Sequence, residues 1–148
     1  MMRTGTNLND RGIRRAVALA FPLLWLSLTG CGGKPSTQFK IPPEEAGREN
    51  PVKATAQTIA EGGASYLKFD CEVCHGKNGS GKGFMAGASS YNCRDWRDPN
   101  ALKSFTDGAL FYIINKGKGN MPGYERRVNS QDAWSMINYI HSLAKQTP

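Results

Sequence analysis

The sequence predicts an all-α fold in which three main helices are joined by long loops. Three segments place apolar residues at the spacing of a helix, at residues 58–69, 106–117 and 130–145. No segment shows the alternation of apolar and polar residues that is typical of a half-exposed strand. Residues 76–100 are rich in glycine, proline, asparagine and aspartate, which favour loops. The length of 148 residues indicates one domain.

The first 30 residues have the composition of a secretory signal peptide. Residues 1–15 carry four arginines and one aspartate, and 13 apolar or small residues follow from Ala16 to Leu28. This run is shorter than the about 20 residues that span a bilayer, and Pro22 interrupts it. It ends in LTGC, which resembles the lipobox of bacterial lipoproteins. The resemblance implies that Cys31 is lipidated and becomes the first residue of the mature protein.

We therefore expect an exported protein that is lipid-anchored on the periplasmic side of a bacterial membrane. The alternative is an ordinary export signal with a chance cysteine, but Cys31 ends the apolar run directly. Residues 31–52 contain four prolines and no apolar periodicity, which predicts a flexible tether. The folded domain is then expected at residues 53–148. Without the arginines of residues 1–30 the protein is only mildly basic, far from the charge typical of nucleic-acid binding.

The first helix, at residues 58–69, is expected to begin at Thr58, which has Glu61 at capping-box spacing. Gly62 and Gly63 cost stability within a helix, and this indicates the close approach of another element. The apolar stripe of this helix comprises Ile59, Tyr66 and Leu67.

The stretch CEVCHGKNGSGKG, residues 71–83, carries the strongest chemical signal. Cys71-x-x-Cys74-His75 is the attachment signature of a c-type haem. Two thiols at this spacing add to the two haem vinyl groups, and the adjacent histidine is placed under the iron as an axial ligand. We therefore expect one covalent haem c, which would also stabilise a small core with long loops by cross-linking it.

Three other chemistries fit this stretch less well. A phosphate-binding loop would lack its magnesium-binding hydroxyl, because Gly83 follows Lys82. A structural zinc site needs four ligands, and the remaining candidates, Cys93 and His141, form no second paired motif. A thioredoxin-like dithiol needs a βαβ context that is not seen. A thiol oxidoreductase remains as a weaker alternative of a different class.

The second helix, at residues 106–117, is expected to start at Thr106 and to end at Gly117. The glycine-rich segment that follows carries Met121, whose thioether would be the second axial ligand and would raise the haem potential. Met85 lies in another glycine-rich stretch and competes for this role. The adjacent Pro122 stiffens the turn of Met121 and favours it.

The third helix, at residues 130–145, is the strongest of the three. Ser130 is a suitable N-cap, and an acidic residue lies in the first turn. Its apolar stripe comprises Trp134, Ile137, Ile140 and Leu143.

From about Thr58 to Ala144 the chain resembles a monohaem class I cytochrome c. The helix before CEVCHG, the stretch TDGALFYIINKGKGNMPGY and the final WSMINYIHSL occur in the order of that family. The family commonly has an aromatic residue four positions before the first haem cysteine, where this chain has Leu67. The resemblance implies thioethers at Cys71 and Cys74, iron ligation by His75 and Met121, and a crossing of the first and last helices at Gly63 and Tyr139.

A six-coordinate iron has no open position for a substrate, so we expect single-electron transfer rather than catalysis. Expected partners are a quinol-oxidising complex, a terminal oxidase or an exported dehydrogenase. A haem enzyme or gas sensor with an open iron site is the main alternative. Cys93 is left without a role, and we expect an inert thiol. A candidate basic rim for an acidic partner, or else a solvated polar face, is formed by Lys77, Lys82, Lys116 and Lys118.

Overall fold

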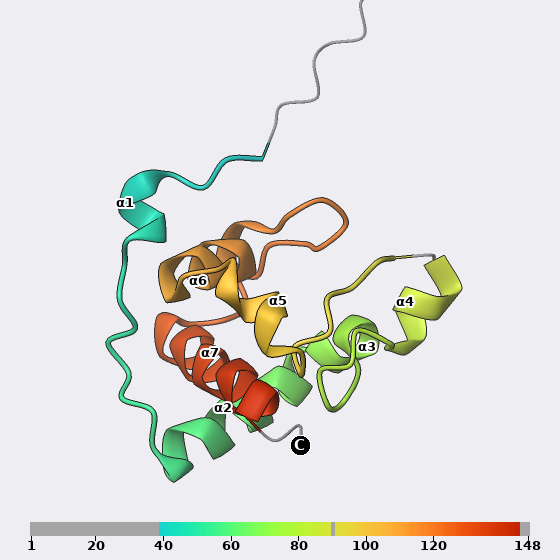
Figure 1. The fold of residues 1–148 in the computed structure, drawn as a ribbon, viewed down its shortest axis with the longest axis horizontal. Helices are drawn as coiled ribbons and strands as arrows, with labels where there is room; N and C mark the ends of the chain where they lie inside the picture. Colours follow the sequence, from blue (N-terminus) through green and yellow to red (C-terminus); the bar gives the residue numbers. More distant parts are fainter. Residues whose placement is uncertain (1–38, 90, 146–148) are drawn as a thin grey trace, which may run out of the picture. The chain divides into compact units, whose positions relative to one another are not determined.

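The computed structural model describes residues 39–89 and 91–145, and within them the chain is helical (Figure 1). No strand forms in these ranges, although Lys118 and Met121 make one isolated antiparallel bridge. The all-α prediction is confirmed. The helices are α1 (Pro43–Ala46), α2 (Ala56–Lys68), α3 (Cys71–His75), α4 (Phe84–Ser89), α5 (Pro99–Lys103), α6 (Asp107–Lys116) and α7 (Ser130–Lys145).

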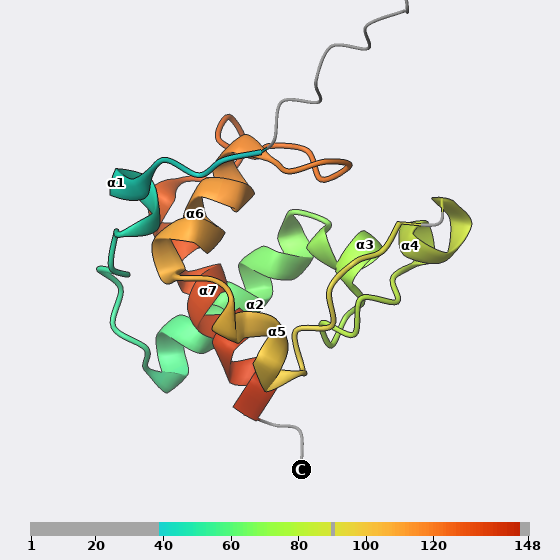
Figure 2. The same ribbon diagram turned by 45° about the horizontal axis from the view of Figure 1, so that its top comes forward.

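The main packing contact joins α2 to α7, which cross at two glycines of α2 (Figure 2). Gly62 lies directly against the backbone of Ser135, so close that a Cβ at this position would overlap the Ser135 carbonyl. A Cβ on Gly63 would lie 3.2 Å from the ring of Tyr139. The expected crossing at Gly63 and Tyr139 is therefore confirmed, and Gly62 marks its closest point.

The start of α2 lies earlier in the sequence than we expected. Thr55 is the N-cap, and its hydroxyl accepts a hydrogen bond from the Thr58 amide at 3.2 Å. The Thr58 hydroxyl in turn accepts a hydrogen bond from the Thr55 amide at 2.9 Å. A Thr–Thr pair thus replaces the expected Thr58–Glu61 box, because the hydroxyl of Thr58 reaches the N-cap amide as a glutamate would.

The aromatic position before the haem motif is also resolved. Leu67 is 48% exposed, so its place in the expected apolar stripe is wrong. Tyr66 is only 2% exposed and packs against Tyr139, with ring centroids 5.3 Å apart. Its hydroxyl donates to the Gly76 carbonyl at 2.8 Å, which links α2 to the end of α3. Tyr66 therefore supplies the buried aromatic ring that Leu67 lacks.

Helices α6 and α7 form as expected. Thr106 caps α6 by accepting from the Ala109 amide at 3.1 Å, and Gly117 ends it with a φ of 81°. The stripe of α7 is buried, and Trp134 stacks on Phe111 of α6 with ring centroids 4.0 Å apart. Among the described residues no helix has both the length and the apolar character needed to cross a membrane.

Residues 39–52, for which we expected a flexible tether, instead pack on the helical core. Helix α1 contacts α6, and the Thr106 hydroxyl donates to the Ala46 carbonyl. The Asn50 amide donates to the Trp134 carbonyl at 3.1 Å and to Asn138 Oδ1 at 3.0 Å. The tether prediction is therefore wrong for this part of the chain. Side-chain amides hold it, and such bonds leave no apolar periodicity in the sequence.

Candidate functional site

The CEVCH motif forms the short helix α3, which is held in place at both ends. Asp70 precedes it in the left-handed conformation, with a φ of 61°, and turns the chain out of α2. Gly76 follows it with a φ of 77°, and its carbonyl accepts the hydroxyl of buried Tyr66. The motif is thereby fixed relative to α2 rather than lying on a free loop.

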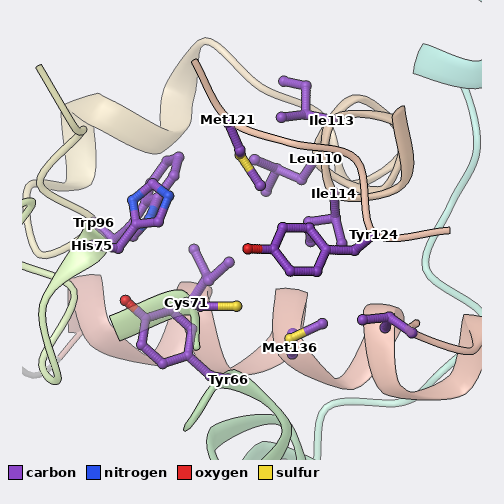
Figure 3. Close-up of a pocket in the computed structure, with 12 residues that line it drawn as sticks. Tyr66, Cys71, His75, Trp96, Leu110, Ile113, Ile114, Met121, Tyr124 and Met136 are labelled. Atoms are coloured by element: carbon purple, nitrogen blue, oxygen red, sulfur yellow. The ribbon is translucent and has the colours of Figure 1, made fainter. Parts of the chain in front are cut away.

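Cys71, Cys74, His75 and Met121 all line one cavity of about 350 Å³. A narrower, almost wholly apolar cavity of about 50 Å³ shares Cys71, His75 and Met121 with it. Figure 3 shows this inner part, with His75 and Cys71 presented from α3 and Met121 from the loop after α6. The two predicted ligand segments, 46 residues apart in the sequence, are therefore brought together.

The His75 imidazole is suited to bind a metal. Its Nδ1 atom is buried and has no hydrogen-bond partner, and burial lowers the pKa of the ring. A lowered pKa keeps the imidazole neutral, which is the form that coordinates a metal. The Trp96 ring lies 5.7 Å away and restricts the orientation of the imidazole.

The thiol of Cys71 has the wrong acidity for a redox dithiol. Burial, with a smaller contribution from Glu72, raises its pKa to about 12. Reactive CxxC thiols instead have lowered pKa values, since the thiolate is the attacking species. Among residues 39–89 and 91–145, no group of three or more histidine, cysteine, aspartate or glutamate side chains is placed to hold a metal ion.

Met121 is positioned by the backbone of its own loop. Lys118 and Met121 exchange two backbone hydrogen bonds of 2.9 and 3.0 Å. The Tyr124 amide donates to the Ile114 carbonyl at 2.9 Å and returns the loop to α6. Met85, the competing candidate, lies on α4 and lines neither cavity. The arrangement supports Met121 as the thioether ligand.

Several lining residues were not among the predicted site residues. Those that matter most for the site are Trp96, Tyr124, Arg94 and Phe105. Of the predicted basic rim, only Lys118 lines the cavity, and Lys116 is paired with Glu125. Cys93 also lines it, and burial followed by the proximity of Cys74 raises its pKa. Loop residues such as Arg94 carry no periodicity that could reveal them.

The donor set fits a haem. Two thiols at CxxC spacing, an adjacent neutral imidazole and a thioether face one cavity with aromatic and aliphatic walls. The predicted leader at residues 1–30 and the predicted lipidation site Cys31 lie outside the described residues.

Comparison with solved structures finds several similar chains. One is a chain of the Kuenenia stuttgartiensis reducing HAO-like protein complex Kustc0457/Kustc0458, with 23% identity and a TM-score of 0.54. The match covers 63% of this chain and 46% of that one, so this chain spans about half of its length. Another is the KustC0563 c-type cytochrome, with 19% identity and a TM-score of 0.48, covering 55% of this chain and 95% of that one. Among curated protein sequences, no significant match is found.

The sequence itself matches a known family over residues 57–140, which span α2, the CEVCH motif, the Met121 loop and most of α7. The family is described as cytochrome C oxidase, cbb3-type, subunit III. It supports a role in electron transfer. The chain therefore belongs to this cytochrome c family and carries a covalently bound haem c.

Proposed function

We propose that this protein is a lipid-anchored carrier of single electrons, with its haem bound through Cys71 and Cys74 and its iron ligated by His75 and Met121. The observation that supports this most is that these four side chains line one cavity, although Met121 stands 46 residues after His75. Two strong axial ligands leave no open position on the iron, and this favours electron transfer over bond chemistry.

Each residue has a separate task in this proposal. The haem supplies an iron that exchanges one electron between its ferrous and ferric states. Cys71 and Cys74 fix the haem to α3, and the Met121 thioether raises its potential. The aromatic and aliphatic walls exclude water, which further favours the less charged ferrous form. Tyr66 and Trp96 hold α3 and the His75 ring in place, so little reorganisation accompanies electron transfer.

Covalent attachment is tested with a double variant, Cys71→Ser with Cys74→Ser. We expect it to lose all haem that survives denaturation, because no thioether can form. Cys93→Ser is the matched control, since Cys93 lines the same cavity and lies outside the motif. Denaturing electrophoresis with a haem stain makes the measurement. A stained band for the double variant, or none for Cys93→Ser, would contradict the assignment.

The lipid anchor at Cys31 would keep the domain close to the membrane. Residues 32–38 separate Cys31 from Phe39, where the described chain begins. A fully extended chain gains at most about 3.6 Å per residue, so the reach is below about 30 Å. We expect Cys31→Ser to move the holoprotein from the detergent phase to the aqueous phase in a phase-separation experiment, with unchanged haem bands. Equal partitioning of wild type and variant would exclude the anchor.

The partners that fit this position are a quinol-oxidising complex, a terminal oxidase or an exported dehydrogenase. The carrier would meet them in a thin layer beside the membrane, at raised effective concentration. A fixed role as the haem subunit of one such complex is equally compatible with the fold. These assignments are tested in native membranes that are supplied with a quinol or with oxygen. The haem bands report whether the protein is reduced or oxidised. Bands that respond to neither would rule out a place between quinol and oxygen.

A further inference from the structure

Two cations on the wall of the cavity have no acidic partner. Arg94 and Lys118 both line it, and neither takes part in an ion pair within the described residues. Other cations are neutralised by acidic neighbours, including Arg48, Arg97, Lys116 and Arg127. A cavity that otherwise presents mostly apolar walls therefore retains two uncompensated positive charges, which favours an anionic group in its ligand.

Both cations lie over the ring of Phe105. The Arg94 guanidinium carbon lies 4.8 Å from the centre of the Phe105 ring, and the Lys118 ammonium lies 5.4 Å from it. Arg94 also donates to the Ala101 carbonyl at 3.4 Å, and Lys118 lies 5.4 Å from the Phe39 ring. The two charges come from different loops, one before α5 and one after α6, and Phe105 brings them to the same place.

The thiol end of the cavity has a different set of charges. Glu72, Asp70 and Arg127 are the charged groups that act most on Cys71. Asp70 and Arg127 form a pair with a 3.7 Å separation. Arg127 at this end is paired with Asp70, and Glu72 adds a further acidic group, so this end offers no unpaired cation to a carboxylate.

We propose that Arg94 and Lys118 bind the two propionate groups of the haem, with Phe105 holding both cations in position. The inference rests on the proposed attachment at Cys71 and Cys74. In a haem the two vinyl groups and the two propionates lie on different edges of the ring. Thioethers at Cys71 and Cys74 fix the vinyl edge, so the propionates lie away from the thiols. Carboxylates held in a cavity require cations or hydrogen-bond donors.

This pairing has a consequence for the acidity of the propionates. A cation within ion-pair distance lowers the pKa of a carboxyl group by about one to three units. The pKa of a propionate is higher when the iron is ferrous, because the ferric iron carries one more positive charge. The midpoint potential therefore falls with rising pH between the ferric and ferrous values of this pKa. The two cations keep that interval at low pH.

The double variant Arg94→Gln with Lys118→Gln tests the proposal through the midpoint potential as a function of pH. We expect the pH-dependent interval to rise by about one unit or more. Above it, we expect the ferrous form to be disfavoured about tenfold, which is about 59 mV for a one-electron couple. Lys103→Gln is the control, because it removes a positive charge from α5 at a residue that does not line the cavity. Its midpoint potential should depend on pH as that of the wild type does. Identical curves for the double variant and Lys103→Gln would overturn the proposal.

A second measurement uses the unaltered protein, in case the double variant acquires no haem. In the reduced wild-type holoprotein, we expect nuclear Overhauser contacts between the propionate methylene protons and the Phe105 ring. Contacts of those methylenes with Tyr66 instead of Phe105 would refute the assignment. Failure of haem attachment itself would show as an absence of haem bands in wild type, which is distinct from a haem that is bound in another orientation.

Discussion

Replacing Met121 with alanine is expected to lower the haem midpoint potential and to abolish the weak near-infrared band of the iron–sulfur bond. Thioether ligation stabilises ferrous haem, and axial ligands spread haem potentials over about 0.8 V. We therefore expect a fall on the order of 0.1–0.3 V within that span. Optical redox titration measures the potential, and the spectrum of the oxidised protein shows the band.

Met85→Ala is the matched control for this change, because Met85 lies on α4 and lines neither cavity. It should keep both the band and the wild-type potential. Carbon monoxide binding separates the remaining functions, since under the proposed ligation the Met121→Ala iron would have an open position and the wild-type iron would not. A band that survives in Met121→Ala, or rapid carbon monoxide binding by the wild type, would favour a haem enzyme or gas sensor.

Replacing Gly62 with alanine is expected to destabilise the protein strongly through the α2–α7 crossing. The added methyl group would overlap the backbone carbonyl of Ser135. Neither helix backbone can move aside as a flexible side chain could. Such overpacking lowers the free energy of unfolding by about 1–3 kcal/mol and occasionally more. Because the clash is with backbone, we expect a loss of about 3 kcal/mol here. Denaturant unfolding of the holoprotein, followed by circular dichroism, measures the loss of stability.

Gly87→Ala provides the control, because Gly87 lies in α4 and a Cβ there would meet nothing within 4 Å. Alanine is the better helix former by about 1 kcal/mol, so this variant should be as stable as wild type or slightly more stable. Gly63→Ala should fall between the two, since its contact is the ring of Tyr139, which can shift. Equal stabilities for the Gly62 and Gly87 variants would show that the crossing tolerates a wider separation.

The sequence was informative where the determining interactions are local. The buried stripe of α7 and the capping residue Thr106 depend on spacings of a few residues, and both were predicted. The CxxCH motif likewise places three groups through its own spacing. By contrast, Asn50 stabilises residues 39–52 through bonds to positions more than 80 residues away. Only the fold brings such groups together, so their sequence context contains no sign of the contact.

The same distinction explains the parts of the site that were missed. Arg94 and Phe105 lie in loops without periodicity, and only the fold brings them together. Tyr66 and Leu67 are neighbours in the expected apolar stripe of α2, yet Tyr66 is buried and Leu67 is exposed. Spacing within one helix defines a face only to within a residue or so, whereas packing selects the residue that is buried.

The α2–α7 crossing also contributes to the entropic cost of folding this chain. Gly62 and Ser135 stand more than 70 residues apart, so their contact closes a loop that contains nearly the whole domain. Closing a loop of that length costs about 4 kcal/mol in chain entropy. Under the proposed ligation, His75 and Met121 on one iron would close a shorter internal loop within it. The Met121→Ala variant should therefore unfold at a lower denaturant concentration, in addition to having a lower potential.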